Sequence, residues 1–320
     1  MILVVTNRSD HTADFGVVEM QRRGVPYFRF NTEDFPHATR TSLRFASEGI
    51  TGGLTTTKGT VRLGDIHSVW FRRPLMPTPA REIVEPRARQ FSTVESLAYI
   101  EGLWRTLDCF WVSKPDRIRA AESKLLQLKI ARDLGFSIPN TLVTSDPDEA
   151  RDFLAATNKV VYKPLRQSRL QHQRGAMLIF TSVVHDSHVS QLEAVKYAPC
   201  IFQEYVPKQF EVRLTVFGTQ VFATEIHSQT TEDAKDDWRR SPARAVPHRA
   251  HTLPQKVEAK CVQLVETLGL AFGAIDMVLT PQGEYVFLEI NPNGQWAWIE
   301  QRTGQRMSRS LVDLLVDGRV

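Results

Sequence analysis

Three oxygen-bearing side chains near the end of the chain have the types and spacing of a metal site. Two apolar runs rich in β-branched and aromatic residues flank a Pro-Gln-Gly turn, which predicts a β-hairpin. If Thr280 lies opposite Tyr285, antiparallel counting places Asp276 opposite Glu289, and Asn291 leaves its strand on the same face as Glu289. Two buried carboxylates need a cation, and oxygen donors without His or Cys suit magnesium. An edge hairpin with solvated polar residues is the alternative.

Several basic side chains stand where packing does not require them. Lys163 ends an apolar strand predicted over 159–163, although a lysine at a strand end is also a common guard against aggregation. The loop that follows carries Arg166, Arg169 and Arg174, which could close over a phosphate site and exclude water. A solvated loop explains the same residues equally well.

Two further strands carry charged residues that could contact an anion. A short strand predicted near residue 70 ends in Arg72 and Arg73, and arginine forks suit planar carboxylates; structural pairing is an equally good explanation. Over 210–217 the residues alternate, with Glu211 and Arg213 on one face and aliphatic residues on the other. We therefore expect these two charged side chains to lie outside the hydrophobic core.

Arg72 and Arg73 lie in the N-terminal third of the chain, which is predicted to form a small α/β domain. A βαβ beginning is predicted without a Gly-x-Gly-x-x-Gly turn, so nucleotide binding is not expected here. A strand-turn-strand pattern over 43–63 assigns its turns to Gly52-Gly53 and Lys58-Gly59. Helical periodicity is expected over 14–23 and 91–107.

The remainder of the chain predicts a mixture of helices and strands. One helix is expected over 116–134, and an amphipathic helix over 253–268. Strands are expected at 200–206, 210–217, 221–226 and 272–279, ahead of the hairpin's second strand. The polar stretch 227–251 is long for a structureless loop, which favours a functional segment or disorder.

Composition sets the outer limits. With 320 residues, two or three domains are expected, and 42% hydrophobic with 24% charged residues is ordinary for a globular protein. No apolar run reaches membrane-spanning length, and three cysteines fit neither a disulfide framework nor a zinc site, so we expect a cytoplasmic location. The net charge of +4 permits an anionic partner, but no nucleic-acid-binding motif is present.

The order of these features resembles the ATP-grasp superfamily. The matching elements are a helix lysine (Lys124), Tyr-Lys-Pro at 162–164, Gln-Glu-Tyr-Val at 203–206, Glu-x-Arg at 211–213, Trp-Arg at 238–239 and Asp…Glu-x-Asn at 276–291. Within it, Glu-Ile-Asn-Pro-Asn-Gly-Gln-Trp at 289–296, Trp-Phe-Arg-Arg-Pro at 70–74 and Asp-Asp-Trp-Arg-Arg at 236–240 resemble the peptide maturases that make microviridins and other graspetides. One departure is a lid region with Gly175 as its one glycine, which puts its phosphate contacts in doubt.

The resemblance implies an α+β ATP-grasp fold in which two α+β subdomains clasp ATP, behind a small N-terminal α/β (pre-ATP-grasp) domain. The implied boundaries are 1–115, 116–200 (with the lid) and 201–320. The implied cofactors are ATP and magnesium (Mg2+), and the implied assembly is a homodimer.

The resemblance also implies roles for single residues. Those assigned to the nucleotide are the phosphate ligands Lys124 and Lys163, the adenine contacts Gln203, Glu204, Tyr205 and Val206, Glu211 near the ribose, and Arg239 facing the phosphates. Asp276, Glu289 and Asn291 would bind magnesium, and Arg213, with Arg239, would steady the reacting groups. Candidates for peptide contacts are Arg72, Arg73, Arg166, Arg169, Arg174 and Arg240.

The expected function is an ATP-dependent macrocyclase that joins Asp or Glu side chains of a precursor peptide, which has a leader and an acidic core, to Thr or Ser hydroxyls or to Lys. An intermolecular ligase of the glutamate-ligase kind shares all the ATP residues and is the alternative. A basic nucleic-acid-binding protein is a distant third hypothesis.

Overall fold

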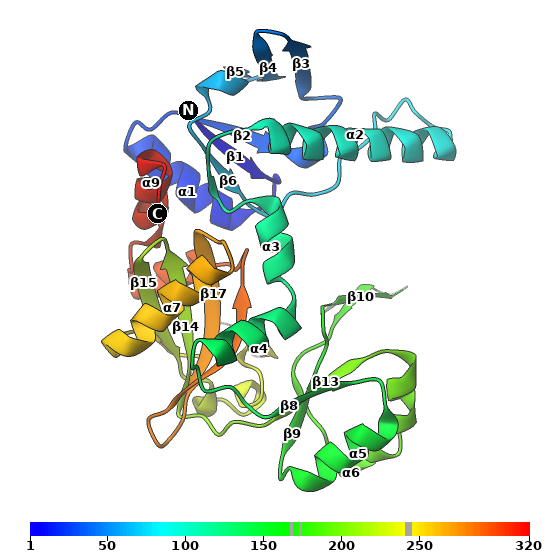
Figure 1. Ribbon diagram of the computed structural model, residues 1–320, viewed down its shortest axis with the longest axis vertical. Helices are drawn as coiled ribbons and strands as arrows, with labels where there is room; N and C mark the ends of the chain where they lie inside the picture. The colour runs from blue at the N-terminus through cyan, green and yellow to red at the C-terminus, as the bar shows by residue number, and fades with distance from the viewer. Residues whose placement is uncertain (167–168, 173–174, 241–244) are drawn as a thin grey trace.

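The computed structural model describes the chain except residues 167–168, 173–174 and 241–244, and gives no side-chain surroundings over 167–178. Figure 1 shows the N-terminal part stacked on a C-terminal sheet, with a central unit beside that sheet. The arrangement is a mixed α/β fold. The boundaries at 115 and 200 stay predictions.

The N-terminal part is built on a parallel sheet of order β2-β1-β6-β7. Its strands and first helix are β1 (Ile2–Thr6), α1 (His11–Arg22), β2 (Tyr27–Asn31), β6 (Ser68–Phe71) and β7 (Phe110–Val112). The apolar residues of β1 are fully buried, as a central parallel strand requires. Asp10 caps α1 by accepting from the amides of Thr12 and Ala13, and Gly24, at φ +64°, follows its end.

An outlying sheet and a long helix complete this part. They are β3 (Arg40–Ala46), β4 (Gly49–Thr56), β5 (Gly59–Arg62) and α2 (Pro86–Thr106). The turn predicted at Gly52-Gly53 is wrong, because both glycines lie within β4. A Cβ at Gly52 would lie 2.1 Å from the carbonyl oxygen of Ser42, so the glycine there permits close approach of two strands.

The single helix predicted over 116–134 is in fact two helices. They are α3 (Pro115–Ala121) and α4 (Lys124–Asp133). The helix is interrupted at Glu122-Ser123. The Ser123 hydroxyl caps α4 by accepting from the amide of Leu126 at 3.5 Å. The break places Lys124 in the first turn of a new helix that points at the C-terminal sheet.

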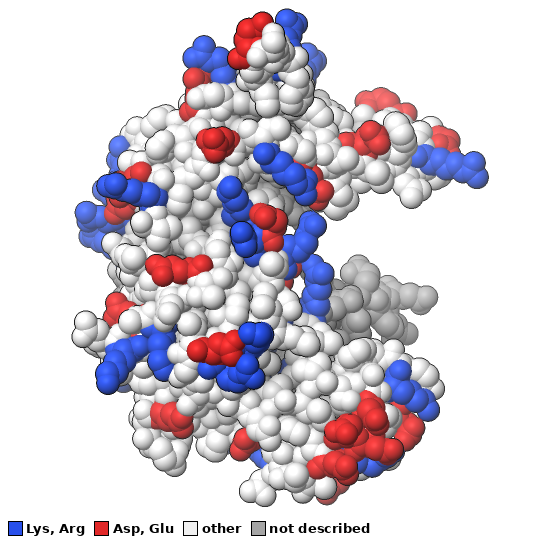
Figure 2. All heavy atoms as spheres, in the orientation of Figure 1, with Lys and Arg blue, Asp and Glu red and all other residues white. Residues whose placement is uncertain are grey.

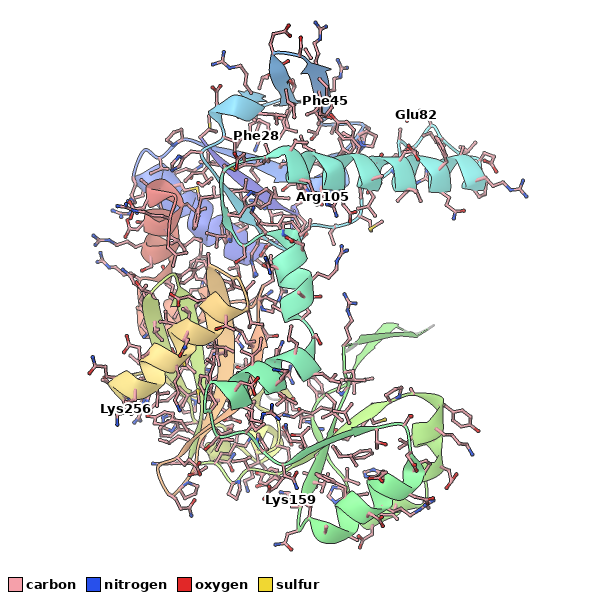
Figure 3. The ribbon with its side chains drawn as sticks, in the orientation of Figure 1. Phe28, Phe45, Glu82, Arg105, Lys159 and Lys256 are labelled. Carbon is pink, nitrogen blue, oxygen red and sulfur yellow. The ribbon has the colours of Figure 1, made fainter. Side chains whose placement is uncertain are left out.

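The central unit is a sheet of order β12-β9-β13-β8 covered by short helices. Its elements are β8 (Thr141–Thr144), α5 (Pro147–Ala156), β9 (Val160–Lys163), β12 (Ser182–Val183), α6 (Asp186–Val189) and β13 (Cys200–Glu204). Between β9 and β12 the backbone forms a separate hairpin of β10 (Arg169–His172) and β11 (Gly175–Leu178). In Figure 3, Lys159 marks the point where this unit meets the C-terminal part, and its ammonium lies 3.9 Å from the Asp236 carboxylate.

The C-terminal sheet has the order β16-β15-β14-β17-β18. Its strands and helices are β14 (Phe210–Phe217), β15 (Gln220–Ile226), β16 (His248–His251), α7 (Gln255–Thr267), β17 (Phe272–Leu279), β18 (Tyr285–Asn291), α8 (Ala297–Thr303) and α9 (Met307–Asp317). One core lies between α7, α4 and the sheet, and a second joins α9 to the N-terminal part. In that second core Trp296 stacks on Trp70 with ring centroids 6.5 Å apart.

The hairpin of β17 and β18 has a more complicated register than the one predicted. Near the turn Leu279, not Thr280, lies opposite Tyr285. The register then shifts by one residue between Asp276 and Met277, which leaves Leu288 as the extra residue of a β-bulge. The shift restores the predicted pairing of Asp276 with Glu289.

Candidate active site

The hairpin forms one wall of a cavity of about 600 Å³ between the central and C-terminal sheets. We call this cavity the site pocket. Its lining contains the predicted catalytic residue Arg213 and all of the predicted nucleotide and metal residues, namely Lys124, Lys163, Gln203, Glu204, Tyr205, Val206, Glu211, Arg239, Asp276, Glu289 and Asn291. In Figure 2, basic side chains gather around the hollow between the N-terminal part and the central unit.

The carboxylates of Asp276 and Glu289 and the amide of Asn291 lie together on the hairpin, and we call this part of the lining the pocket floor. Asp276 receives two hydrogen bonds from Arg213 Nη1, at 2.8 and 2.7 Å, and one from Asn291 Nδ2 at 3.0 Å. Burial outweighs the favourable charge of Arg213 and, together with the negative charge of Glu289, raises the pKa of Asp276. The floor therefore holds more negative charge than Arg213 alone offsets.

Glu289 is compensated by cations from other elements. Lys124 Nζ lies 3.2 Å from its carboxylate. Burial disfavours the ionised form of Glu289, but Lys124, Lys163 and Arg239 together outweigh burial and lower its pKa to about 2.

Helix α4 positions Lys124 through a side-chain clamp on β18. Gln127, one turn later, donates to the Ile290 carbonyl at 2.8 Å and accepts from the Ile290 amide at 3.1 Å. Because residues three apart share a helix face, the clamp directs Lys124 toward Glu289 on the same strand. Lys124 also donates to the Pro164 carbonyl at 3.2 Å, which ties α4 to the end of β9.

Lys163 lies at the end of β9 and donates to Gln203 Oε1 at 2.6 Å. The adjacent strands β9 and β13 bring these two side chains together. Burial lowers the pKa of Lys163 to about 8, although Glu289 opposes the shift. Burial therefore disfavours the protonated form of Lys163, and a bound phosphate group would stabilise that form.

Glu211 and Arg213 are buried, with exposed fractions of 8% and 7%. They nevertheless stay outside the apolar core, because both line the site pocket and both are paired. Glu211 accepts from Lys208 Nζ at 2.6 Å and from the Ser228 hydroxyl at 2.5 Å.

Arg239 lies in a short 3-10 helix (Trp238–Arg240) and is held by its neighbour Asp237. Its guanidinium donates to both Asp237 oxygens, at 2.8 and 2.5 Å. Burial opposes the charge on each partner, but their pairing raises the pKa of Arg239 and lowers that of Asp237. Arg240 points elsewhere, toward Ser182 Oγ at 2.8 Å.

Arg72 and Arg73 occupy different environments. The Arg72 side chain is 1% exposed, with Nε 3.3 Å from Asp10, and Nη1 donates to the carbonyls of Asn293 and Gly294 at 2.5 and 3.2 Å. It does not line the site pocket, so any contribution to peptide binding would be indirect. Arg73 does line the pocket and is exposed.

Of the remaining peptide-contact candidates, the structure describes the side chains of Arg166 and Arg240, and neither lines the site pocket. Arg166 is exposed and lies 3.2 Å from Glu122. Arg174 lies outside the described residues, and the same holds for the side chain of Arg169.

Three groups were missed by reasoning from the sequence. Lys208 and Asp237 each pair with a predicted residue, and the Asn293-Gly294 segment receives Arg72. Asp237 had a signal, since an aspartate two residues before an arginine can accept from it. Lys208 and the carbonyls of 293–294 had none, because strand order and chain packing create those contacts.

The predicted metal residues carry the oxygen donors that magnesium prefers. Within the described part of the chain, no three His, Cys, Asp or Glu side chains form a cluster able to hold a metal. The pocket offers two carboxylates and one amide instead, a set of oxygen donors that fits a magnesium ion whose remaining ligands are phosphates and water. Burial and the charge of Glu289 raise the pKa of Asp276, and a magnesium ion bound beside it would lower that pKa again.

Residues 121–315 match the family model of the RimK-like ATP-grasp domain, and residues 1–119 match that of the MvdD pre-ATP grasp domain. The chain belongs to the RimK-like ATP-grasp family. This match confirms the predicted superfamily and fold class. It also confirms the prediction that the protein is a ligase, and ATP-grasp enzymes use ATP.

Solved ATP-grasp structures resemble the whole chain. A RiPP-associated ATP-grasp ligase from Chryseobacterium gregarium, solved with ADP and a leader and core peptide, is 32% identical with a TM-score of 0.92, covering 99% of this chain and 96% of its own. The macrocyclases MdnC, bound with precursor peptide MdnA, and MdnB, both from Microcystis aeruginosa, are 29% and 30% identical with TM-scores of 0.86 and 0.81, covering 99% of each chain.

Curated ATP-grasp relatives match a smaller part. A probable alpha-L-glutamate ligase from Xylella fastidiosa is 23% identical over 201 residues, which is 62% of this chain. The chain thus spans 64% of that relative's length. Among the described residues, no helix has the length and apolarity needed to cross a membrane.

Proposed function

We propose that this ATP-grasp ligase is a macrocyclase of a ribosomally made precursor peptide. It activates Asp or Glu side chains as acyl-phosphates and joins them to Thr or Ser hydroxyls, or to Lys, of the same peptide. The observation that supports this best is coverage. The macrocyclase structures align with 99% of the chain, including the N-terminal part, whereas the glutamate ligases match 62% of it.

The residues of the site pocket supply what the first step needs. A substrate carboxylate attacks the γ-phosphorus of ATP, the bond to the β-phosphate oxygen breaks, and ADP leaves. Lys124 and Lys163 would hold the phosphates, and Arg239 would offset charge as it moves between anions. Bound magnesium would neutralise the phosphates, held by Glu289, Asn291 and Asp276.

Arg213 would serve the second step. A hydroxyl or amine of the peptide attacks the acyl carbon, loses its proton to solvent, and phosphate departs. Because both ends belong to one peptide, closure is effectively intramolecular. The Arg213 guanidinium, fixed by Asp276 and by the Gln295 carbonyl at 3.4 Å, would stabilise the oxyanion that forms on the way.

The binding of the nucleotide base and the assembly are also proposals. Residues 203–206 border the pocket at the end of β13, where their backbone would contact adenine, and Glu211 would lie near the ribose. The homodimer implied by the family resemblance is a prediction that sedimentation can check.

The decisive experiment uses an acidic, Thr-rich precursor peptide encoded beside the gene. Incubated with the protein, ATP, magnesium and free glutamate, it should lose one water per ring by mass spectrometry, and should stay unchanged when ATP is omitted. The second candidate, an intermolecular glutamate ligase, is favoured by the curated relatives. A mass gain of one added amino acid would support that candidate, and an unchanged peptide would refute the macrocyclase.

A further inference from the structure

The N-terminal sheet presents its ligand-binding edge to the site pocket. In the order β2-β1-β6-β7 the chain leaves β1 for β2 on one side and returns to β6 on the other. Open α/β sheets bind ligands at such a switch point, beyond the carboxyl ends of the strands. Arg73 lies at this edge, two residues after the end of β6, and lines the pocket.

The backbone of Arg73 is held in an unfavourable conformation. Its φ is +28°, although it is not glycine and precedes Pro74. The Asn7 side chain, just beyond β1, donates to the Arg73 carbonyl at 2.6 Å, and the Arg72 amide donates to the Val5 carbonyl at 2.7 Å. Strain that neighbouring residues hold in place is typical of residues that must present a side chain to a ligand.

Charge pairing distinguishes Arg73 from the other cations of the pocket. Four of those cations have a carboxylate within 3.2 Å, in the pairs Lys124–Glu289, Lys208–Glu211, Arg213–Asp276 and Arg239–Asp237. Two basic residues of the pocket lining remain, Arg73 and Lys163. In the described part of the chain, neither has a carboxylate within 4.0 Å. The undescribed side chains, at 167–178 and 241–244, include no Asp or Glu.

Lys163 differs from Arg73 in its remaining partners. The Lys163 ammonium donates to Gln203 on the side of the pocket assigned to ATP, where its other N–H groups would serve the phosphates. Among the described residues, the side-chain hydrogen bond found for Arg73 runs from Nε to the Asn293 carbonyl at 3.2 Å. The terminal nitrogens of Arg73 are thus available to a planar anion that enters from the N-terminal side.

We propose that Arg73 binds the side-chain carboxylate of the peptide before that carboxylate is phosphorylated. The inference rests on the proposed function, since it assumes an acidic peptide substrate. A carboxylate that approaches ATP is repelled by the negative charge of the phosphates. A cation without an acidic partner at the mouth of the pocket offsets that repulsion and orients the carboxylate.

The test is a cycle between Arg73 and the acids of the peptide. Dissociation constants are measured, with ADP and magnesium present, for a synthetic copy of the precursor core and for one with its Asp and Glu replaced by Asn and Gln. The wild type should prefer the acidic peptide by about tenfold or more. Arg73→Gln should reduce this preference to about twofold or less, and Arg73→Lys should fall between, because a point charge replaces the fork.

The control is Arg44→Gln, which removes the same charge from an exposed position on β3, in the outlying sheet far from the pocket. An unchanged preference in Arg73→Gln, or an equal loss in Arg44→Gln, overturns the proposal. Arg73→Lys decides the matter if Arg73→Gln does not fold. Wild-type ring formation is scored separately, so that absent rings refute the macrocyclase, while rings with an unchanged preference refute only the role of Arg73.

Discussion

Replacing Arg213 by alanine should separate acyl transfer from ATP binding. In the structure Arg213 contacts the floor of the pocket and the segment after β18, where a Cβ on Gly294 would lie 2.7 Å from its Nη2. Those contacts place it beside Asp276, a proposed metal ligand, which we expect to lie at the phosphate end of the nucleotide. We therefore expect ring formation to fall by about 10²- to 10³-fold, the usual effect of removing one charge-stabilising donor. The KM for ATP should change much less.

Arg213→Ala should also cost stability, by an amount that depends on pH. Removing one partner of a fully buried ion pair costs about 3 to 5 kcal/mol, and because the Asp276 carboxylate is only half-buried we expect a cost at or below the lower end of that range. The pKa of Asp276, already raised by burial, would rise further, so the folded variant binds a proton that the unfolded chain releases. The penalty is consequently smallest at low pH and grows as pH rises.

Three measurements check this reasoning. Urea unfolding at pH 5 and pH 8 gives the penalty, peptide mass spectrometry gives ring formation, and steady-state kinetics give the KM for ATP. The variant Asp276→Asn/Arg213→Ala is the control, since without the buried acid its stability should lose the pH dependence. Parallel loss of ATP affinity and ring formation would assign Arg213 to the nucleotide. A penalty that is equal at both pH values would refute the ion-pair argument.

Further predictions concern Glu289 on the pocket floor, Lys163 at the end of β9, and Gly294. Glu289→Ala should abolish magnesium-dependent ring formation with the fold kept, as seen by circular dichroism; wild-type rings would disprove the metal assignment. Because the pKa of Lys163 is about 8 and phosphate should raise it, ATP affinity should be flat below pH 8 and fall above it by up to about tenfold per unit, while Lys163→Arg should remove the break. Gly294→Ala would place a Cβ 2.4 Å from that of Ala274 and should cost about 1 to 3 kcal/mol in thermal unfolding; an unchanged melting temperature would contradict the close fit.

Many local features of this structure could be predicted from the sequence. Alternation in 210–217 and the β-rich runs around the hairpin predicted strands, and the resemblance named the residues that now line one pocket. The break at Glu122-Ser123 was missed because apolar periodicity continues across it, whereas the capping serine acts only once α4 packs on β18. The pairing of Asp276 with Glu289 was right although its counting began one residue off, because the bulge at Leu288 shifts the register by one residue.

What the sequence could not predict is how the two motifs that suggested a peptide maturase meet. In Trp-Phe-Arg-Arg-Pro, Trp70 stacks on Trp296 and Arg72 donates to the Asn293 carbonyl, so that this motif clasps the segment following Asn291. A buried arginine with main-chain partners is costly to misplace, because burial already lowers the pKa of Arg72 to about 10. The clasp therefore fixes the N-terminal sheet, with Arg73 at its edge, against the strand that carries the proposed metal ligands. A peptide carboxylate bound at that edge would be held in register with the phosphates, which would give the N-terminal part and the hairpin with the proposed metal ligands a shared role in one site.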